Sequence, residues 1–133
     1  MSRSPQQMFA RMLPVLFLAA AAAAIVVHVE GEDAYAVRNC LPMAAVLLLS
    51  FITLWLGDGE WLGRGWRWPL GVLGFSIPAI GLSLYLHYSY AVNLNEMFSG
   101  TENPVEVFRY LPAYTTVSGG LGFAIGWIVG SRI

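Results

Sequence analysis

The sequence predicts an all-α integral membrane protein, a bundle of four transmembrane helices. Four apolar stretches each approach the ~20 residues that an α-helix needs to cross a bilayer. The composition is 57% hydrophobic and 11% charged, whereas soluble domains carry about 25% charged residues. The four stretches contain no Asp, Glu, Lys or Arg, and they cover residues 12–29, 40–57, 69–92 and 112–131.

The length and charge of the chain exclude several classes of function. The 133 residues leave room for one transmembrane domain, residues 1–133, and for no separate catalytic head. A net charge of -1 does not provide the basic surface of a nucleic-acid-binding protein. The sequence contains no GxxxxGK[ST], HExxH, GxSxG or CxxC motif, and Cys40 has no second cysteine for an internal disulfide. We therefore expect no catalytic residues and no metal site.

The first apolar stretch has two interpretations. Arg3 and Arg11 precede the apolar residues 13–27, and Ala-Tyr-Ala follows at 34–36, which together also fit a signal peptide with its cleavage site. We expect the segment to be retained as the first membrane helix. The alanine run at 19–24 gives this helix a smooth surface that suits either an ordinary helix or a close helix contact.

Arginines predict the orientation, because short loops rich in Arg and Lys stay on the cytoplasmic side. Five arginines fall on one side of the four predicted spans, whereas the other two loops hold six acidic residues and only two arginines. Both termini are therefore predicted to be cytoplasmic, in a bacterial inner membrane. The five arginines are Arg3, Arg11, Arg64, Arg67 and Arg132.

Aromatic residues divide between the two predicted boundaries in the same way. All five tryptophans map to the cytoplasmic boundary and all six tyrosines to the outer one. Trp and Tyr are enriched at membrane interfaces, where one side of the ring is apolar and the other is wet. This separation favours four full crossings. The residues are Trp55, Trp61, Trp66, Trp68 and Trp127 inside, and Tyr35, Tyr85, Tyr88, Tyr90, Tyr110 and Tyr114 outside.

The two longer loops are predicted to differ in structure. The glycine-broken segment 58–68 carries tryptophans and arginines, which is typical of a headgroup-level membrane anchor. In the outer loop 93–111, Asn103, Pro104 and Glu106 match the N-cap, N1 and N3 positions of a short helix. We expect an amphipathic helix there, lying on the outer leaflet between helices 3 and 4.

The fourth stretch carries the strongest packing signal. Ser118, Gly122, Gly126 and Gly130 repeat every four residues and form a small-xxx-small ridge, or glycine zipper. Helices in lipid associate through close backbone approach, since no hydrophobic force drives them together. The ridge predicts a tight helix contact, either inside the bundle, for example with the alanine run at 19–24, or with another subunit.

The only two histidines are candidate cofactor ligands. His28 ends the first predicted helix, and His87 lies near the outer end of the third, so both are predicted at a common depth. Two imidazoles on facing helices are the ligand set of bis-His haem b. A quinone contact of His87 with Tyr85 or Tyr88 is a further alternative. Interfacial histidines are also common as ordinary polar side chains, and no cofactor is expected in that case.

These observations favour a small non-catalytic accessory or scaffold subunit of a larger inner-membrane complex, acting through transmembrane helix packing. Its partners would be the lipid bilayer and other integral membrane subunits, or further copies of the chain. The alternative is a small redox subunit that binds haem b or quinone through His28 and His87. A pore or carrier is the third hypothesis. The predicted spans offer hydroxyl side chains but no acid or base at the midplane, which does not favour a proton- or cation-coupled carrier.

Overall fold

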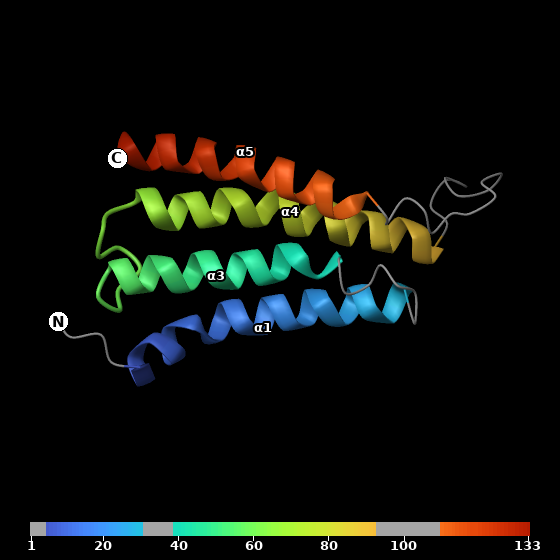
Figure 1. The fold of residues 1–133 in the computed structure, drawn as a ribbon, viewed down its shortest axis with the longest axis horizontal. Coiled ribbons are helices and arrows are strands. Elements are labelled where there is room, and N and C mark those ends of the chain that lie inside the picture. The colour runs from blue at the N-terminus through green and yellow to red at the C-terminus, as the bar shows by residue number, and fades with distance from the viewer. Residues whose placement is uncertain (1–4, 31–38, 93–109) are drawn as a thin grey trace.

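The structure, a computed structural model, describes residues 5–30, 39–92 and 110–133. This part of the chain consists of four helices and contains no strand (Figure 1). The helices are α1 (Pro5–Glu30), α3 (Leu41–Leu56), α4 (Arg67–Val92) and α5 (Leu111–Ser131). The all-α prediction is thereby confirmed.

Three of the helices match the predicted spans within two residues at each end, but α1 does not. It begins at Pro5 rather than at Met12. Proline is favourable in the first helical turn, where its missing N–H costs no hydrogen bond, and the Gln6, Gln7 and Arg11 side chains that follow are compatible with a helix. The amphipathic helix predicted at Asn103 to Glu106 lies outside the described residues.

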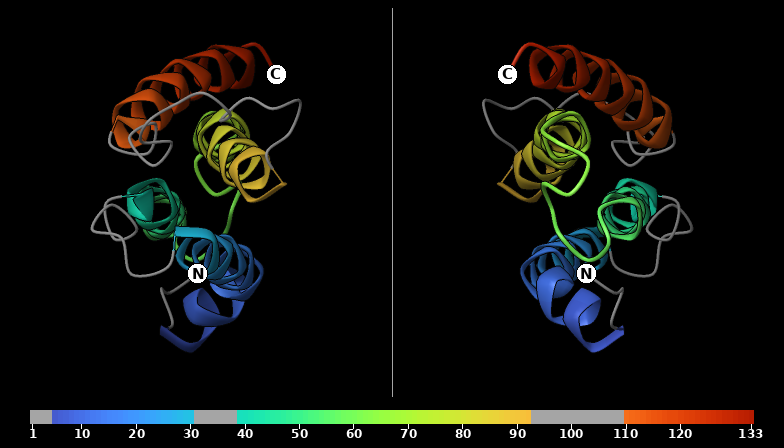
Figure 2. Two further views of the ribbon diagram at one scale, coloured as in Figure 1. Left: turned by 90° about the vertical axis from the view of Figure 1, so that its right-hand side faces the viewer. Right: turned by 90° about the vertical axis from the view of Figure 1, so that its left-hand side faces the viewer.

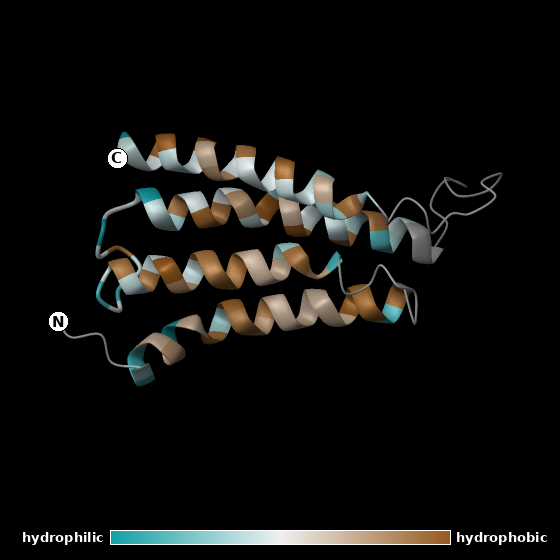
Figure 3. Cartoon of the chain, viewed as in Figure 1, coloured by the Kyte–Doolittle hydropathy of each residue, from teal (hydrophilic) through white to brown (hydrophobic). Residues whose placement is uncertain are grey.

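Two of the helices are long and apolar enough to cross a membrane, namely Pro5–Val29 and Arg67–Ser89. The apolar α3 is shorter, with 16 residues. The 21 residues of α5 are sufficient in length, but this helix is not among those that pass the test of hydropathy. Figure 3 shows apolar residues along all four helices, and hydrophilic ones chiefly at the loop and at the helix ends.

The helices are not arranged symmetrically around one axis. Helices α1, α3 and α4 each pack against the other two, whereas α5 packs mainly on α4 and only slightly on α3. Viewed along the bundle, α5 and α1 lie on opposite sides of the molecule (Figure 2). The end of the bundle where α1 begins also holds the α3–α4 loop and the C-terminus (Figure 1). We call this the loop end.

Small residues bring the first three helices together. One buried cluster joins Ala19, Ala22 and Val26 of α1 to Met43 of α3. The spacing of three and four residues places the α1 members on one helix face. A second cluster continues toward the loop end with Val46, Phe75 and Ala79.

Large apolar side chains cover the outside of the bundle. Phe9, Leu13 and Phe17 on α1 are 62%, 49% and 73% exposed, and we call this stripe the α1 outer face. Val117, Leu121, Ile125 and Ile128 form a similar stripe, the α5 outer face, with 57% to 64% exposure. Contiguous apolar surface of this extent is rare on a soluble monomer.

The loop between α3 and α4 is folded tightly on itself. A Cβ atom on Gly57 or Gly63 would overlap backbone atoms of the facing part of the loop, so the two halves of the loop can meet only without side chains at these positions. Gly59, with φ of 90°, provides the left-handed turn between them. The loop is tied to α1, because Arg11 forms an ion pair with Glu60 and Gln7 donates to the same carboxylate over 3.3 Å.

Candidate functional site

Backbone contact between α4 and α5 is the closest helix packing in the structure. Gly122 lies against Gly74, Gly126 against the Leu70 carbonyl, and Gly130 against the backbone at Arg67. Each step of four residues along α5 is matched by a step of three or four residues backwards along α4. The two helices are therefore antiparallel and in register over about two turns, at a distance that only glycine permits.

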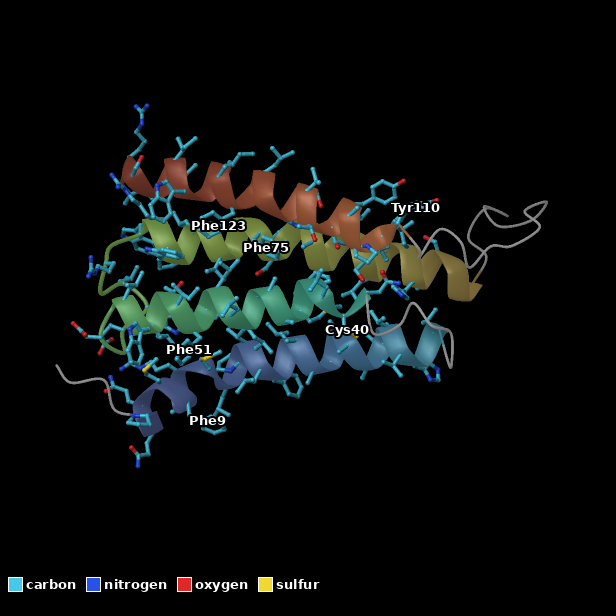
Figure 4. The ribbon with its side chains drawn as sticks, viewed as in Figure 1. Phe9, Cys40, Phe51, Phe75, Tyr110 and Phe123 are labelled. Carbon is cyan, nitrogen blue, oxygen red and sulfur yellow. The ribbon has the colours of Figure 1, made fainter. Side chains whose placement is uncertain are left out.

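The ridge packs within the chain, and its neighbour is α4 rather than the alanine run of α1. Ser118 lies at the margin, where its hydroxyl donates to the Tyr114 carbonyl over 2.7 Å, and Gly119 makes the closer contact. A Cβ on Gly119 would lie 2.7 Å from the Phe75 ring, and one on Gly71 would lie 2.8 Å from the Phe123 ring. Each helix thus places a phenylalanine over a glycine of the other (Figure 4 labels both rings).

Gly71 and Gly74 complete this contact, and sequence reasoning did not identify them. The signal was present, since two glycines three residues apart lie on one side of an apolar helix. The glycine repeat of α5 is more regular, and it predicts only one of the two helix faces that form the contact.

Aromatic rings close the loop end of the α4–α5 pair. Trp68 packs edge-on against both Phe123 and Trp127, with ring centroids 5.8 and 5.3 Å apart, and the latter two rings stack at 5.9 Å. The Arg67 guanidinium lies 5.8 Å from the Trp127 centroid, within cation–π range. Two of the predicted boundary tryptophans are therefore also packing residues.

The structure places the two histidines in different surroundings. His28 is exposed on α1, whereas His87 is fully buried on α4. The Nδ1–H of His87 donates to the Ser83 carbonyl over 2.7 Å, a bond of the kind that orients metal-ligating imidazoles. Ligation of one haem by both residues would require α1 to turn His28 inward, and it stays a prediction.

Five of the nine serine and threonine hydroxyls within the described helices bond to the backbone of their own helix. Thr53 donates to the Leu49 carbonyl and Ser76 to the Val72 carbonyl, each over 2.7 Å, and Thr115 donates to the Leu111 carbonyl. This is the usual role of Ser and Thr in apolar helices. Ser50, Ser83 and Ser89 are buried, and their hydroxyls have no hydrogen-bond partner among the described residues.

A groove lies where α1, α3 and α4 meet. Its volume is about 240 Å³, and it is lined by apolar side chains of all three helices and by Trp61 of the loop. Ser50 and Ser76 also line it. Within the described residues, no group of three His, Cys, Asp or Glu side chains is arranged to hold a metal ion.

Comparisons with known proteins return no similar family, curated protein or solved structure.

Proposed function

We propose that the chain is an integral protein of a bacterial inner membrane, crosses the bilayer four times with both termini in the cytoplasm, and serves as a non-catalytic scaffold subunit of a larger membrane complex. The observation that carries this proposal is the pair of exposed apolar stripes on opposite sides of the molecule, the α1 and α5 outer faces. Each stripe can contact a neighbouring membrane helix by van der Waals packing.

Two further observations support the orientation. Trp61, Trp66 and Arg64 belong to the loop at the end where α1 begins and α5 ends, as the positive-inside rule and the aromatic belts require for cytoplasmic termini. The exposed tyrosines lie toward the end of the bundle opposite the loop end, with Tyr85 and Tyr88 in the last turns of α4, Tyr110 at the N-cap of α5 and Tyr114 in its first turn.

Of the two roles predicted for the glycine ridge, the contact between α4 and α5 supports packing inside the bundle. Because α4 covers Gly122, Gly126 and Gly130, these residues hold the protein itself together and leave the outer stripes to receive partners. A substitution in the ridge should therefore lower the stability of the chain, whereas a substitution in a stripe should weaken the contact with a partner.

Purification in mild detergent tests the proposal. We expect membrane proteins to co-purify with the tagged chain in fixed proportion. We also expect Leu121→Ala/Ile125→Ala or Leu13→Ala/Phe17→Ala to release a partner while the chain keeps its thermal stability. A chain that migrates alone, or only with copies of itself, would exclude the hetero-complex.

A redox subunit is the second candidate, because the Nδ1–H bond from buried His87 to the Ser83 carbonyl is of the kind that orients metal-ligating imidazoles. The absorption spectrum of the same preparation distinguishes it, since a bound haem gives a Soret band. A pore is less well supported, because Thr53, Ser76 and Thr115 direct their hydroxyl hydrogens to their own helices.

A further inference from the structure

A second groove runs along the contact between α4 and α5, on the outside of the bundle. Its volume is about 320 Å³, and it is lined only by apolar side chains and glycines of these two helices. Gly74 and Gly122 lie where the two backbones meet and form its floor. Ile77 and Ile125, each 64% exposed, form its walls. We call it the α4–α5 groove, and it is open to a molecule that approaches from the side of the bundle.

Two arginines lie at the loop end of this groove. Leu70 on α4 and Val129 on α5 are the lining residues nearest that end. Arg67 precedes Leu70 by three residues and Arg132 follows Val129 by three, so each continues the lining face of its helix by one turn. Gly130 lies against the backbone at Arg67, which brings the two arginines to the same level of the bundle.

Both arginines are accessible to an anion. Their side chains are exposed, and neither forms an ion pair within the described part of the chain, whereas Arg11 at the same end is paired with Glu60. The Arg67 guanidinium lies 5.8 Å from the centroid of the Trp127 ring, a contact that orients the cation without neutralising it. The first turn of α4 contains no acidic residue that would compete for the two cations.

The opposite end of the groove is uncharged and lies near the middle of α4. The lining extends along α4 from Leu70 to Pro78, about 12 Å at 1.5 Å per residue, and half of a hydrocarbon core is about 15 Å. One turn beyond Pro78 and Gly122, positions 81–82 and 118–119 carry no charge. In the proposed orientation, the groove therefore begins at the cytoplasmic headgroup level and ends near the bilayer midplane.

The occupant that fits combines an anionic head with an apolar chain of about one leaflet in length. The cytoplasmic leaflet contains anionic phospholipids, which arginines at its surface attract. We propose that the α4–α5 groove binds one anionic phospholipid, with an acyl chain along Gly74 and Gly122 and its phosphate at Arg67 and Arg132. A phosphatidylcholine brings a cation of its own to the two arginines and is therefore disfavoured.

Native mass spectrometry of the purified chain, released from dodecyl maltoside micelles, tests this proposal. The micelles are supplied either with palmitoyl-oleoyl phosphatidylglycerol or with phosphatidylcholine of the same acyl chains. We expect the first phosphatidylglycerol to bind at least about 5-fold more tightly than the first phosphatidylcholine. This ratio corresponds to about 1 kcal/mol, the attraction of one arginine for an anionic lipid surface.

Arginine variants test the recognition of the head group. Arg132→Gln should lower the affinity for phosphatidylglycerol about 3- to 10-fold and leave the affinity for phosphatidylcholine unchanged. Arg64→Gln is the matched control, because it removes the same charge at the same end of the bundle. The Arg64 Nε–H donates to the Leu56 carbonyl at the end of α3, away from the groove, so this variant should keep the preference.

Variants of the apolar wall test the position of the acyl chain. Ile77→Ala should lower the affinity for phosphatidylglycerol about 2- to 5-fold, because it removes dispersion contacts along the chain. Leu121→Ala is the matched control, since Leu121 is 63% exposed and does not line the groove, and it should bind as the wild-type protein does. Circular dichroism and melting of each variant confirm that the fold is retained.

Four results would each overturn the proposal. They are equal affinity for the two phospholipids, equal loss in Arg132→Gln and Arg64→Gln, unchanged binding in Ile77→Ala, and displacement of phosphatidylglycerol by an equal concentration of oleate, which would assign the groove to a free fatty acid. The inference rests on the proposed membrane insertion. Its failure is distinguishable from failure of the scaffold function, because co-purified partners decide the latter.

Discussion

Replacement of Gly126 tests the α4–α5 contact most directly. A Cβ at this position would overlap the Leu70 carbonyl oxygen and lie 2.6 Å from its carbon. Carbon atoms in contact prefer about 3.5–4.0 Å, so the helices must separate by roughly 1 Å, and a gap of this size forfeits a quarter to a half of each dispersion contact. We expect Gly126→Ala to cost about 1–3 kcal/mol of stability and Gly126→Ile to cost more.

Gly120 provides the matched control. It lies on the same helix and is exposed, and a Cβ there would meet no atom within 4 Å. Gly120→Ile should therefore change stability by no more than about 0.5 kcal/mol. Unfolding of both variants is followed by far-ultraviolet circular dichroism during heating or titration with a denaturing detergent. Equal stability of Gly126→Ile and Gly120→Ile would refute the backbone contact.

Three further predictions concern the loop end, the topology and the buried histidine. Removing the Arg11–Glu60 ion pair with Glu60→Gln should lower the free energy of unfolding by less than about 1 kcal/mol, because the Arg11 and Glu60 side chains are 36% and 37% exposed. A double-mutant cycle with Arg11→Ala measures the coupling energy of the pair. A larger coupling energy would contradict its assignment as a surface pair. In a Cys40→Ala background, Ser131→Cys should resist a membrane-impermeant thiol reagent in intact cells and react after lysis, whereas labelling of intact cells would place the C-terminus outside. If the chain binds haem, His87→Ala should abolish the Soret band of the purified protein, and a colourless wild-type preparation with its partners intact would argue against haem.

Local sequence properties predicted the helices well, because each depends on residues close together in the chain. Continuous apolar stretches identified all four helices, and the four-residue repeat of glycines identified the face of α5 that packs. The start of α1 was wrong by about two turns, since polar residues such as Gln6, Gln7 and Arg11 end an apolar stretch without ending a helix.

The sequence predicted less well which helix faces pack against each other. The alanine run of α1 and the pair Gly71 and Gly74 of α4 are both smooth surfaces, and the choice between them depends on which neighbour offers a complementary surface in register. For the two histidines, their spacing from apolar or small residues on the same helix could have predicted which one is buried. His28 follows the buried Val26 by two residues and so falls on another side of α1, whereas His87 continues the buried series Phe75, Ala79 and Ser83 along α4.

The position of α5 at one side of the molecule has a consequence for biogenesis. Helices α1, α3 and α4 can meet before α5 has been synthesised, because the contacts among them do not involve it. Until α5 arrives, the α4 surface at Gly71 and Gly74 lacks its partner backbone. If the chain is inserted in the membrane as proposed, a chain stalled before Leu111 would expose this narrow glycine strip of α4 to lipid, and the strip would be covered only when α5 is added.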